Sequence, residues 1–256
     1  MKPEAGHRRW IDDHRQGCLS ATVIWRVLGR THCGIYQNND HRGRISAVLG
    51  VMGLYENWVL PRLLDLAMRN HVLDAYRRKA IESAHGLVLE IGVGSGLNLS
   101  LYGPAVGRVI GLDPLSELLH LARKRAAHLH IPVSFVRASA EHVPFADAAF
   151  DAVVMTWTLC SNPNPIAALI EMRRVLKPGG RLLFVEHGLS PEIRIARWQH
   201  RLTPYWKRVG GGCHLDRKMD DLIQAAGFQV DAVETGYMKG PKPWTFMFQG
   251  WATKQE

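Results

Sequence analysis

Residues 87–98 constrain the fold of this chain more than any other stretch, because they join an apolar run to three closely spaced glycines. The run LVLEI ends at Ile91 and is followed by Gly92, Gly94 and Gly96 at alternate positions. A short apolar run is typical of a strand buried on both faces, and glycines after it let the chain turn sharply. Glycine also takes positive φ at low cost and leaves backbone N–H groups uncovered. The stretch therefore predicts a parallel strand that leads into a ligand-binding loop.

The spacing of the glycines separates two classes of nucleotide-like ligand. A dinucleotide-binding loop has the pattern G-x-G-x-x-G, whereas here the third glycine comes one position early and Leu97 takes its place. Glu90 lies at the end of the predicted strand, where its charge would repel a pyrophosphate and attract an ammonium group. The loop therefore favours S-adenosylmethionine, which carries an amino-acid ammonium, over a nicotinamide dinucleotide.

The composition is that of a globular chain with a basic surface. The 256 residues are 46% hydrophobic and carry a formal net charge of +9, which suits one large α/β domain with a sizeable core. Residues 1–51 hold eight basic and four acidic residues, a net of +4, which leaves +5 for the other 205 residues. Because this charge is not concentrated into a basic and aromatic stripe, we expect no nucleic-acid partner.

The cysteines and histidines predict no metal site. The four cysteines, Cys18, Cys33, Cys160 and Cys213, lie far apart and form no C-x-x-C pair, so we expect reduced thiols in a cytoplasmic protein. The thirteen histidines include no H-x-x-x-H or H-E-x-x-H pair, which a helical zinc site would need. No signal peptide and no apolar run long enough for a membrane span are expected.

The N-terminal quarter of the chain changes character near Met52. Residues 1–51 keep no helical or strand periodicity, so we expect an extension that is poorly ordered or not native, followed by one domain over residues 52–256. From residue 54 to 68, apolar side chains recur at helical spacing, and Pro61 is expected to begin a second helix.

These two helices are expected to cover the core. The alternative is a lid over a substrate, or a peripheral membrane contact through Tyr55 and Trp58, because both aromatic side chains suit either place.

Strands and helices alternate from Gly86 onward, which predicts a parallel sheet with helices on both faces. We expect strands at residues 87–91, 109–112, 133–136, 150–155 and 181–186, the last entered through a turn at 177–180. Helices are expected at residues 115–129 and 165–176. The C-terminal part is expected to add helices at 192–200 and 219–226 and closing strands at 228–234 and 244–251.

Asp113 follows the second predicted strand, where doubly wound folds place an acid against ribose hydroxyls. A carboxylate can accept hydrogen bonds from both hydroxyls. Glu90, the glycine loop and Asp113 would then meet at one edge of the sheet, because ligands bind outside the carboxyl ends of the strands. The alternative is an Asp that only forms a turn before Pro114. The preceding loop makes the cofactor role the preferred interpretation.

Several motifs resemble class I S-adenosylmethionine-dependent methyltransferases. Residues 90–96 resemble motif I of that family, and Asp113 stands in the equivalent of motif II. ASAEHVPFAD at residues 138–147 resembles the G-D-A-E-x-L-P-F-x-D stretch of the type 11, ubiquinone/menaquinone methyltransferase-like subgroup, and residues 174–180 match its R-V-L-K-P-G-G. The resemblance runs from about Met52 to the C-terminus. It implies a Rossmann-like seven-stranded sheet, mostly parallel with an antiparallel last strand, and S-adenosylmethionine as the cofactor.

Shorter motifs resemble bacterial relatives of the methyltransferase-like thiol methyltransferases. They are TLCS at residues 158–161, the pair Glu186-His187, and GGCHL at residues 211–215. This likeness implies methyl transfer to a small, lipophilic acceptor, with a thiol favoured. C- or O-methylation of a quinone precursor and N-methylation of a phospholipid headgroup stay open, because the quinone methyltransferases share the earlier motifs.

The resemblance also implies roles for single residues. The cofactor would be held by Glu90, Gly92, Gly94, Gly96, Asp113, Ser139, Ala140, Glu141 and Thr156. Ser139 stands where the family has an adenine-contacting Asp, and its hydroxyl makes a weaker hydrogen bond than a carboxylate. Either cofactor affinity is reduced or Glu141 compensates.

The acceptor is expected to meet Tyr55, Trp157 and Cys160. Methyl transfer depends on alignment and water exclusion more than on a base. A thiol reacts as its thiolate, so His187 and His214 are the candidates to take its proton or stabilise its charge. The alternative for each is a hydrogen-bonded structural histidine.

Two other classes of protein also fit parts of the sequence. One is an NAD-dependent oxidoreductase, which the glycine spacing disfavours. The other is a non-catalytic module that binds S-adenosylmethionine as a sensor or partner domain.

Overall fold

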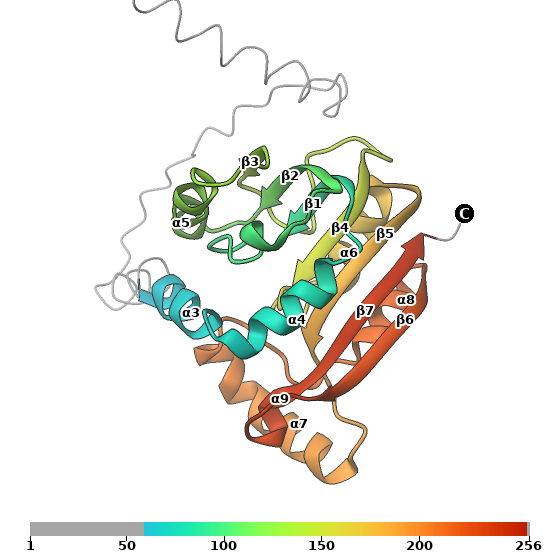
Figure 1. Cartoon of the computed structure of the whole chain (residues 1–256). Coiled ribbons are helices and arrows are strands. Elements are labelled where there is room, and N and C mark those ends of the chain that lie inside the picture. The colour runs from blue at the N-terminus through green and yellow to red at the C-terminus, as the bar shows by residue number, and fades with distance from the viewer. Residues whose placement is uncertain (1–58, 255–256) are drawn as a thin grey trace, which may run out of the picture.

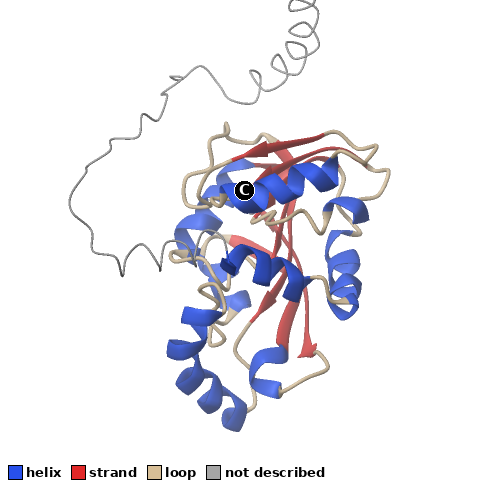
Figure 2. Cartoon of the chain, turned by 90° about the vertical axis from the view of Figure 1, so that its left-hand side faces the viewer, coloured by secondary structure: helices blue, strands red, loops and turns tan. Residues whose placement is uncertain are grey.

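A computed structural model of the chain describes residues 59–254. They form a seven-stranded sheet with the strand order β3-β2-β1-β4-β5-β7-β6 (Figure 1). Neighbouring strands from β3 to β5 run parallel, whereas β7 is antiparallel to both β5 and β6. Helices lie on both faces of this sheet (Figure 2). The predicted fold class is confirmed.

The elements follow one another in the order that the alternating sequence pattern predicts. The strands are β1 (Gly86–Ile91), β2 (Val106–Leu112), β3 (Val133–Val136), β4 (Phe150–Thr156), β5 (Leu176–His187), β6 (Phe228–Tyr237) and β7 (Phe246–Lys254). The helices are α3 (Leu60–Met68), α4 (His71–Ile81), the short 3-10 helix η2 (Leu99–Leu101), α5 (Ser116–Ala126), α6 (Pro165–Val175), α7 (Ile193–Val209), α8 (Met219–Ala225) and α9 (Lys242–Thr245).

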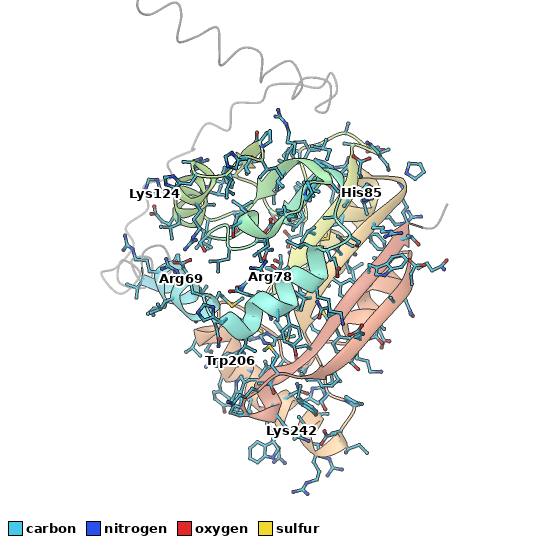
Figure 3. All side chains as sticks on the ribbon, in the orientation of Figure 1. Arg69, Arg78, His85, Lys124, Trp206 and Lys242 are labelled. Carbon is cyan, nitrogen blue, oxygen red and sulfur yellow. The ribbon has the colours of Figure 1, made fainter. Side chains whose placement is uncertain are left out.

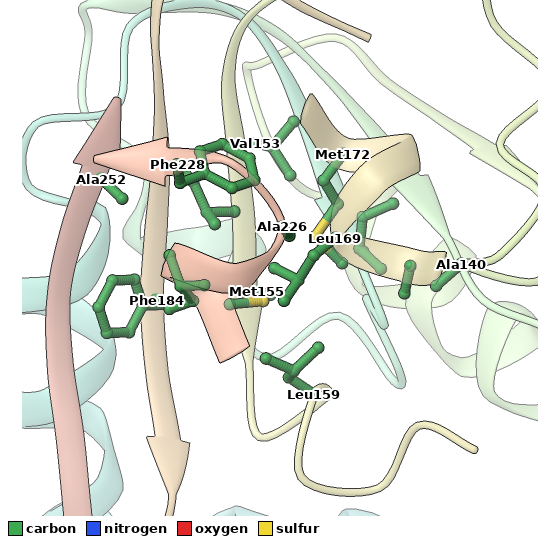
Figure 4. Packing of buried hydrophobic residues seen from close by; sticks show 14 of the residues in the cluster. Ala140, Val153, Met155, Leu159, Leu169, Met172, Phe184, Ala226, Phe228 and Ala252 are labelled. Atoms are coloured by element: carbon green, nitrogen blue, oxygen red, sulfur yellow. The ribbon is translucent and has the colours of Figure 1, made fainter. Parts of the chain in front are cut away.

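The sheet is buried on both faces, because successive residues of its central strands enter opposite halves of the core. Val153 and Met155 of β4 pack with α6 and α8, whereas Ala152 and Val154 pack with α4 and α5. Figure 4 shows Met155 beside Phe184 of the neighbouring strand and the residues of α6. This alternation explains why the strands read as nearly continuous apolar runs in the sequence.

Helix α4 is the element that the sequence prediction missed. Asn70 caps it, since its side-chain oxygen accepts a hydrogen bond from the Val72 N–H at 3.0 Å. The buried face of α4 includes Arg77, which is only 2% exposed. A charged residue at a core position hides the apolar periodicity from which a helix is read.

Two predicted boundaries were wrong near the C-terminal half of the sheet. The turn expected at residues 177–180 is an irregularity within β5, because Phe150 pairs with Leu176 and Ala152 pairs with Arg181. Helix α7 runs to Val209 instead of residue 200. It continues through Pro204, whose missing N–H usually signals the end of a helix.

The last strand also begins later than predicted. Trp244 belongs to the single turn α9, and β7 starts at Phe246. Pro243 and Pro241 favour this turn over an extended strand, since proline fixes φ near its helical value. Trp244 consequently packs edge-on against Trp206 of α7, with ring centroids 5.9 Å apart.

Some sequence predictions lie outside the described residues. They concern the extension at residues 1–51, the helix before Pro61, and the side chains of Tyr55 and Trp58. Within residues 59–254, none of the helices has the length and apolar character needed to cross a membrane.

The order in which the chain adds strands to the sheet reverses between β1 and β4. The chain leaves β1 toward β2 and β3 on one side and returns to β4 on the other. A crevice forms at such a switch point, outside the carboxyl ends of the strands. The glycine loop follows β1, and Trp157 follows β4, so the residues of interest from the sequence border this crevice.

Candidate functional site

A cavity of about 730 Å³ lies at this crevice. It brings together most of the residues that the sequence singles out: Glu90, Gly92, Gly94, Asp113, Ser139, Ala140, Glu141, Thr156, Trp157, Cys160 and His187. Gly96 and His214 are not among its lining residues. The cavity has a polar end beside β1 and β2 and an apolar end beneath α3.

Glu90 is the buried acid of the polar end, only 1% exposed. Its carboxylate accepts hydrogen bonds from the Asn98 amide at 2.9 Å and from the Tyr102 hydroxyl at 2.8 Å. Burial raises the pKa of Glu90 to about 7, although these two donors and the charge of Arg77 act in the opposite direction. A cation bound next to this carboxylate would favour its charged form.

Asp113 receives two backbone hydrogen bonds that fix its carboxylate at the end of β2. The donors are the N–H groups of Gly94, at 3.0 Å, and Leu115, at 2.9 Å. Burial raises the pKa of Asp113, while both backbone donors lower it. Each oxygen holds one donor and can accept another. The turn-forming and ligand-binding interpretations of Asp113 are therefore compatible.

Each of the three glycines of the loop has different surroundings, so a side chain would be tolerated differently at each position. Gly92 has φ +68°, and a Cβ there would lie 2.2 Å from Thr158 Oγ1. Gly94 has φ +54°, and a Cβ there would meet only a backbone oxygen at 3.8 Å, so its neighbourhood is open. A Cβ on Gly96 would press on Ala122 of α5 at 3.1 Å. Gly96 thus allows the loop to pack closely on α5, and its predicted cofactor role stays a prediction.

Ser139 and Glu141 form one polar unit at the cavity wall. The Ser139 hydroxyl donates a hydrogen bond to the Glu141 carboxylate. The departure of Ser139 from the family's Asp therefore leaves a carboxylate within one hydrogen bond of that position. Ala140 lies between them and is buried.

S-adenosylmethionine fits the donor and acceptor set at the polar end. Asn98 Oδ1 is buried and has no hydrogen-bond partner among the described residues, and Glu90 lies next to it with a raised pKa. A buried acceptor without a donor costs free energy. An ammonium group would supply the missing donor and charge. The open space at Gly94 and the free acceptor positions of Asp113 suit the ribose.

Trp157 lines the cavity beside Arg77 and His187. Its φ of +50° lies in the left-handed region, which non-glycine residues rarely adopt. The Arg77 guanidinium lies over its ring, 5.0 Å from the centroid. One face of the indole is therefore occupied by a cation of the protein, and Trp157 serves as a wall of the cavity.

Helix α3 covers the cavity instead of the core, which corrects the preferred interpretation of this region. Leu63, Leu64 and Met68 line the cavity, and no α3 residue belongs to either core cluster. Figure 3 shows Arg69 at the end of α3 and Trp206 on the same side of the molecule. Trp206 also lines the cavity, so α3 and α7 close its apolar end.

Asp65 attaches α3 to the glycine loop. Its carboxylate accepts hydrogen bonds from the Ser95 hydroxyl and from Arg125 of α5, the latter at 2.8 Å. Arg69 also pairs with it. Burial raises the pKa of Asp65, but these three donors outweigh it and hold the pKa below its usual value. These contacts attach α3, which covers the cavity, to the glycine loop and to α5.

Cys160, His187 and Cys213 meet at the apolar end. Cys160 is 1% and Cys213 7% exposed, and Cys213 Sγ lies 3.7 Å from His187 Nδ1. A hydrogen bond to Cys213 and burial raise the pKa of the Cys160 thiol well above its usual range. Both cysteines are free. The raised pKa favours the protonated, weakly nucleophilic form of the Cys160 thiol.

His214 lies in a different environment from His187. Its ring lies 3.8 Å from the Asp216 carboxylate, outside the cavity lining. Burial and the charge of Arg217 lower its pKa. Its backbone N–H donates to the Cys160 carbonyl at 2.8 Å. His214 therefore joins two loops and does not line the cavity, and its predicted catalytic role stays a prediction.

Sequence reasoning missed four polar residues of the site: Asp65, Arg77, Asn98 and Tyr102. Asn98 follows the glycine loop directly, so its position was a usable signal. The other three come from helices α3 and α4 and the segment after η2. Only the packing of these elements on the sheet brings them to Glu90 and Ser95.

A family model described as a methyltransferase domain matches residues 89–184. Thiol S-methyltransferase TMT1B of Homo sapiens is 40% identical over 177 residues, which cover 64% of this chain and 72% of that protein. The Rattus norvegicus protein of the same name is 37% identical over 161 residues, 61% of this chain and 65% of that protein. The chain therefore spans about two thirds of the length of these relatives.

Relatives that are named for other methyltransferase activities match as well. Phosphatidylethanolamine N-methyltransferase of Cereibacter sphaeroides is 37% identical over 61% of this chain and 77% of that protein. Demethylmenaquinone methyltransferase of Thermus thermophilus is 36% identical over 52% of this chain and 62% of that protein. Among solved structures, an S-adenosylmethionine-dependent methyltransferase from Thermotoga maritima has a TM-score of 0.58 and 24% identity, covering 79% of this chain and 99% of that chain. It shares the fold described above.

Proposed function

The chain belongs to the S-adenosylmethionine-dependent methyltransferases, and from this premise we propose that it transfers a methyl group to the sulfur of a small, lipophilic thiol. The observation that carries the choice of acceptor is the apolar end of the cavity. There, leucine, methionine and tryptophan side chains surround two thiols and one imidazole. A lipophilic molecule fits such a surface, whereas a charged headgroup would lose its hydration without gaining a partner.

The polar end holds the methyl donor. When bound, S-adenosylmethionine supplies an electrophilic methyl group on a sulfonium sulfur. Glu90 binds its ammonium group, and Asp113 accepts hydrogen bonds from its ribose hydroxyls. Ser139 and Glu141 border the adenine, and Thr156 supports Asn98 through a 3.0 Å hydrogen bond. These residues orient the donor, which is the main requirement for an in-line displacement.

The apolar end orients the acceptor and excludes water. Helix α3 and Trp206 close this end, and Trp157 forms part of its wall. Among the described residues that line the cavity, His187 is the only one with an imidazole, so we assign it the activation of the acceptor thiol. Desolvation of a thiolate strengthens it as a nucleophile. We retain Cys160 as a pocket residue. Tyr55 stays a proposed pocket residue outside the described part.

A transfer assay with methyl-labelled S-adenosylmethionine tests this proposal. The acceptors are benzenethiol, phenol as its oxygen counterpart, demethylmenaquinone, and vesicles that contain phosphatidylethanolamine. We expect labelled thioether from benzenethiol and at least about tenfold less product from phenol, because a thiol is far more ionised at neutral pH than an alcohol-type oxygen. Product from the quinone or lipid alone would contradict the thiol assignment. Tight cofactor binding with no product from any acceptor would identify a non-catalytic binding module.

We further propose that the protein is cytoplasmic, acts on no nucleic acid and contacts membranes at its surface beside the lid. The free thiols support a reducing compartment. Exposed apolar side chains support the membrane contact, namely Val59 directly before α3 and Leu63 and Leu66 on α3. Flotation with anionic vesicles checks it: Leu66→Glu is expected to reduce the bound fraction, and an unchanged fraction would contradict the contact.

A further inference from the structure

Three separate segments bring metal-binding side chains together at the apolar end of the cavity. Cys160 follows β4, His187 ends β5, and Cys213 lies between α7 and α8. Their ligand atoms, two thiol sulfurs and one imidazole nitrogen, all lie within 4.8 Å of one another. Each of the three side chains also lines the cavity. The group therefore combines a compact ligand set with access to the acceptor.

The distances suit a tetrahedral zinc ion. Zinc binds sulfur at about 2.3 Å and imidazole nitrogen at about 2.0 to 2.1 Å, so neighbouring ligand atoms lie about 3.5 to 3.8 Å apart. Cys213 Sγ and His187 Nδ1 are already 3.7 Å apart. The remaining pairs need to approach by no more than about 1 Å, which small changes of side-chain torsion can supply.

The chemistry of the ligands favours zinc over other common cations. Thiolate sulfur is a soft ligand that selects zinc or copper(I) over magnesium or calcium. Two thiolates and a neutral imidazole neutralise the ion's two positive charges, so the complex adds no net charge to the apolar end. Three protein ligands with one open position are typical of a catalytic zinc site, whereas structural sites have four protein ligands.

Hydrogen bonds of the neighbouring residues hold the segment that carries Cys160 in place. Glu186 is fully buried, and its carboxylate accepts the N–H groups of Thr158, Leu159 and Cys160 at 2.8 to 3.0 Å. The Arg217 guanidinium donates to the Leu159 carbonyl and, at 3.2 Å, to the Cys160 carbonyl. Such supporting contacts orient metal ligands and raise metal affinity.

The segment that carries Cys213 is fixed to the same support. The N–H of His214 donates to the Cys160 carbonyl at 2.8 Å. A Cβ on Gly212 would lie 3.0 Å from the Ser161 carbonyl, which shows how closely the two segments approach. The two cysteines are therefore held together by backbone contacts that do not involve the thiols themselves.

We propose that Cys160, His187 and Cys213 bind a zinc ion whose fourth position takes the sulfur of the acceptor thiol. The metal site stands on the ligand geometry alone, while its use in methyl transfer rests on the proposed thiol acceptor. The acceptor R–SH loses its proton to the solvent as it enters the site and binds the zinc as the thiolate, so His187 activates it as a ligand of the metal and not as a base. The thiolate lone pair then forms the new bond to the methyl carbon, and the carbon–sulfonium bond breaks with its electrons on the cofactor's sulfur. The neutral thioether R–S–CH₃ leaves the zinc.

Metal analysis of the full chain tests the site without any methyl acceptor. The protein is expressed with added zinc, reduced with a phosphine, and measured by mass spectrometry of its metals. We expect about one zinc ion per chain, the stoichiometry of a single three-ligand site. Cobalt(II) added after removal of zinc is expected to give the sulfur-to-metal charge-transfer band and the intense visible bands of a tetrahedral thiolate complex. Absence of both zinc and the cobalt spectrum overturns the proposal.

Matched variants locate the metal. Cys160→Ser with Cys213→Ser removes both sulfur ligands, and His187→Asn removes the imidazole. Cys18→Ser with Cys33→Ser removes the chain's other two thiols as the control. We expect loss of metal and of the cobalt band in the first two variants and full retention in the control. S-adenosylmethionine binding by calorimetry shows whether each variant is folded. A folded cysteine variant that keeps its zinc contradicts the site.

The role in catalysis is tested separately from the role in binding. Benzenethiol added to the cobalt protein is expected to shift the charge-transfer band, and zinc removal is expected to lower kcat for thiol methylation at least about tenfold, with recovery on zinc addition. Equal activity with and without zinc overturns the proposed use of the metal and leaves the thiol acceptor intact. Zinc binding without any thiol methylation refutes the proposed function and leaves the metal site intact.

Discussion

The two ends of the cavity are built in different ways. The polar end takes its main groups from segments that directly follow β1 and β2, and it holds two buried acids, Glu90 and Asp113. The apolar end takes Cys160, His187 and Cys213 from three distant segments and is closed by helices. In the proposed function, the donor is thus recognised by charge and backbone groups at strand ends. The proposed acceptor site consists of side chains that only the folded chain brings together.

This contrast explains how one fold can serve methyltransferases with different acceptors. A cationic, ribose-containing donor needs the same few groups whatever receives the methyl group. Its site can therefore be short and regular in sequence. The acceptor site can vary with the helices and loops that cover it, because loops carry specificity on a common scaffold.

The largest effect is expected for a methyl group added at Gly92. Gly92→Ala places its Cβ 2.2 Å from Thr158 Oγ1 at a φ of +68°. Overpacking and left-handed strain together are expected to cost about 3 kcal/mol or more of unfolding free energy. Gly94→Ala is the matched control, because its Cβ meets nothing closer than 3.8 Å at a φ of +54°. We expect about 1 to 2 kcal/mol for it. Urea unfolding measures both, and equal losses would contradict the distinction.

A second substitution tests whether the polar end and the apolar end of the cavity bind their ligands independently. Asp113→Asn keeps the size of the side chain but removes the charge and one acceptor oxygen that hold the ribose. Loss of a charge-assisted hydrogen bond costs about 1.5 to 3 kcal/mol, so the Kd for S-adenosylmethionine should rise about 10- to 100-fold. Calorimetry checks this. The zinc content is expected to stay unchanged, and its loss would show that the two ends do not act independently.

The pH dependence of cofactor binding should isolate Glu90. Its pKa is raised from 4.5 to about 7 by burial in the cofactor-free protein. The ammonium group needs the carboxylate form, so affinity is expected to rise about fivefold from pH 6 to pH 7.5. Above that pH the ammonium group itself begins to lose its charge, because an α-amino group has a pKa of about 7.7 to 8.0. Glu90→Gln is expected to bind more weakly and to lose the rise below pH 7.5, and a rise that persists in the variant would assign it to another group.

The same raised pKa makes the cofactor-free protein less stable as the pH rises, although it makes cofactor affinity increase. Because the folded-state pKa exceeds the unfolded value, the stabilising contribution of Glu90 is fully present below pH 4.5 and is lost as the pH rises through about 7. Thermal unfolding at several pH values, compared between the protein and Glu90→Gln, separates this contribution from that of other groups.

A smaller effect is expected at the lid. Leu64 of α3 lines the cavity, whereas Leu66 on the same helix is 67% exposed and does not. Leu64→Ala removes about 1 to 2 kcal/mol of apolar contact, so the KM for benzenethiol should rise about 5- to 30-fold. Leu66→Ala, assayed without lipid, should leave it unchanged. Equal effects in both variants would argue against α3 as a wall of the acceptor site.

The smallest effect is expected at the N-terminus. We propose that residues 52–256 form the methyltransferase domain, because the sequence motifs of the family begin after residue 52 and the first strand of the sheet begins at Gly86. Removal of residues 1–51 is therefore expected to leave the Kd for S-adenosylmethionine within about twofold, well below the effect of one lost hydrogen bond. Failure of the shortened chain to bind the cofactor would refute this division.

The donor end was predictable because its signals are local. Residues 90–96, Asp113 and the segment around Ser139 each follow a strand, and parallel strands end at the same edge of a sheet. Periodicity determined most strands, since a sheet buried on both faces needs apolar residues at nearly every position. Local signals failed where a charged side chain is buried, as with Arg77 in α4.

The sequence by itself therefore determined the fold class and the methyl donor, because both depend on short, contiguous patterns. It predicted no metal site, since Cys160, His187 and Cys213 have no regular spacing. Only the tertiary structure gathered these three side chains, placed α3 over the cavity and moved His214 out of it. Contacts between distant segments depend on how strands pair and helices pack, and no local pattern in the chain encodes them.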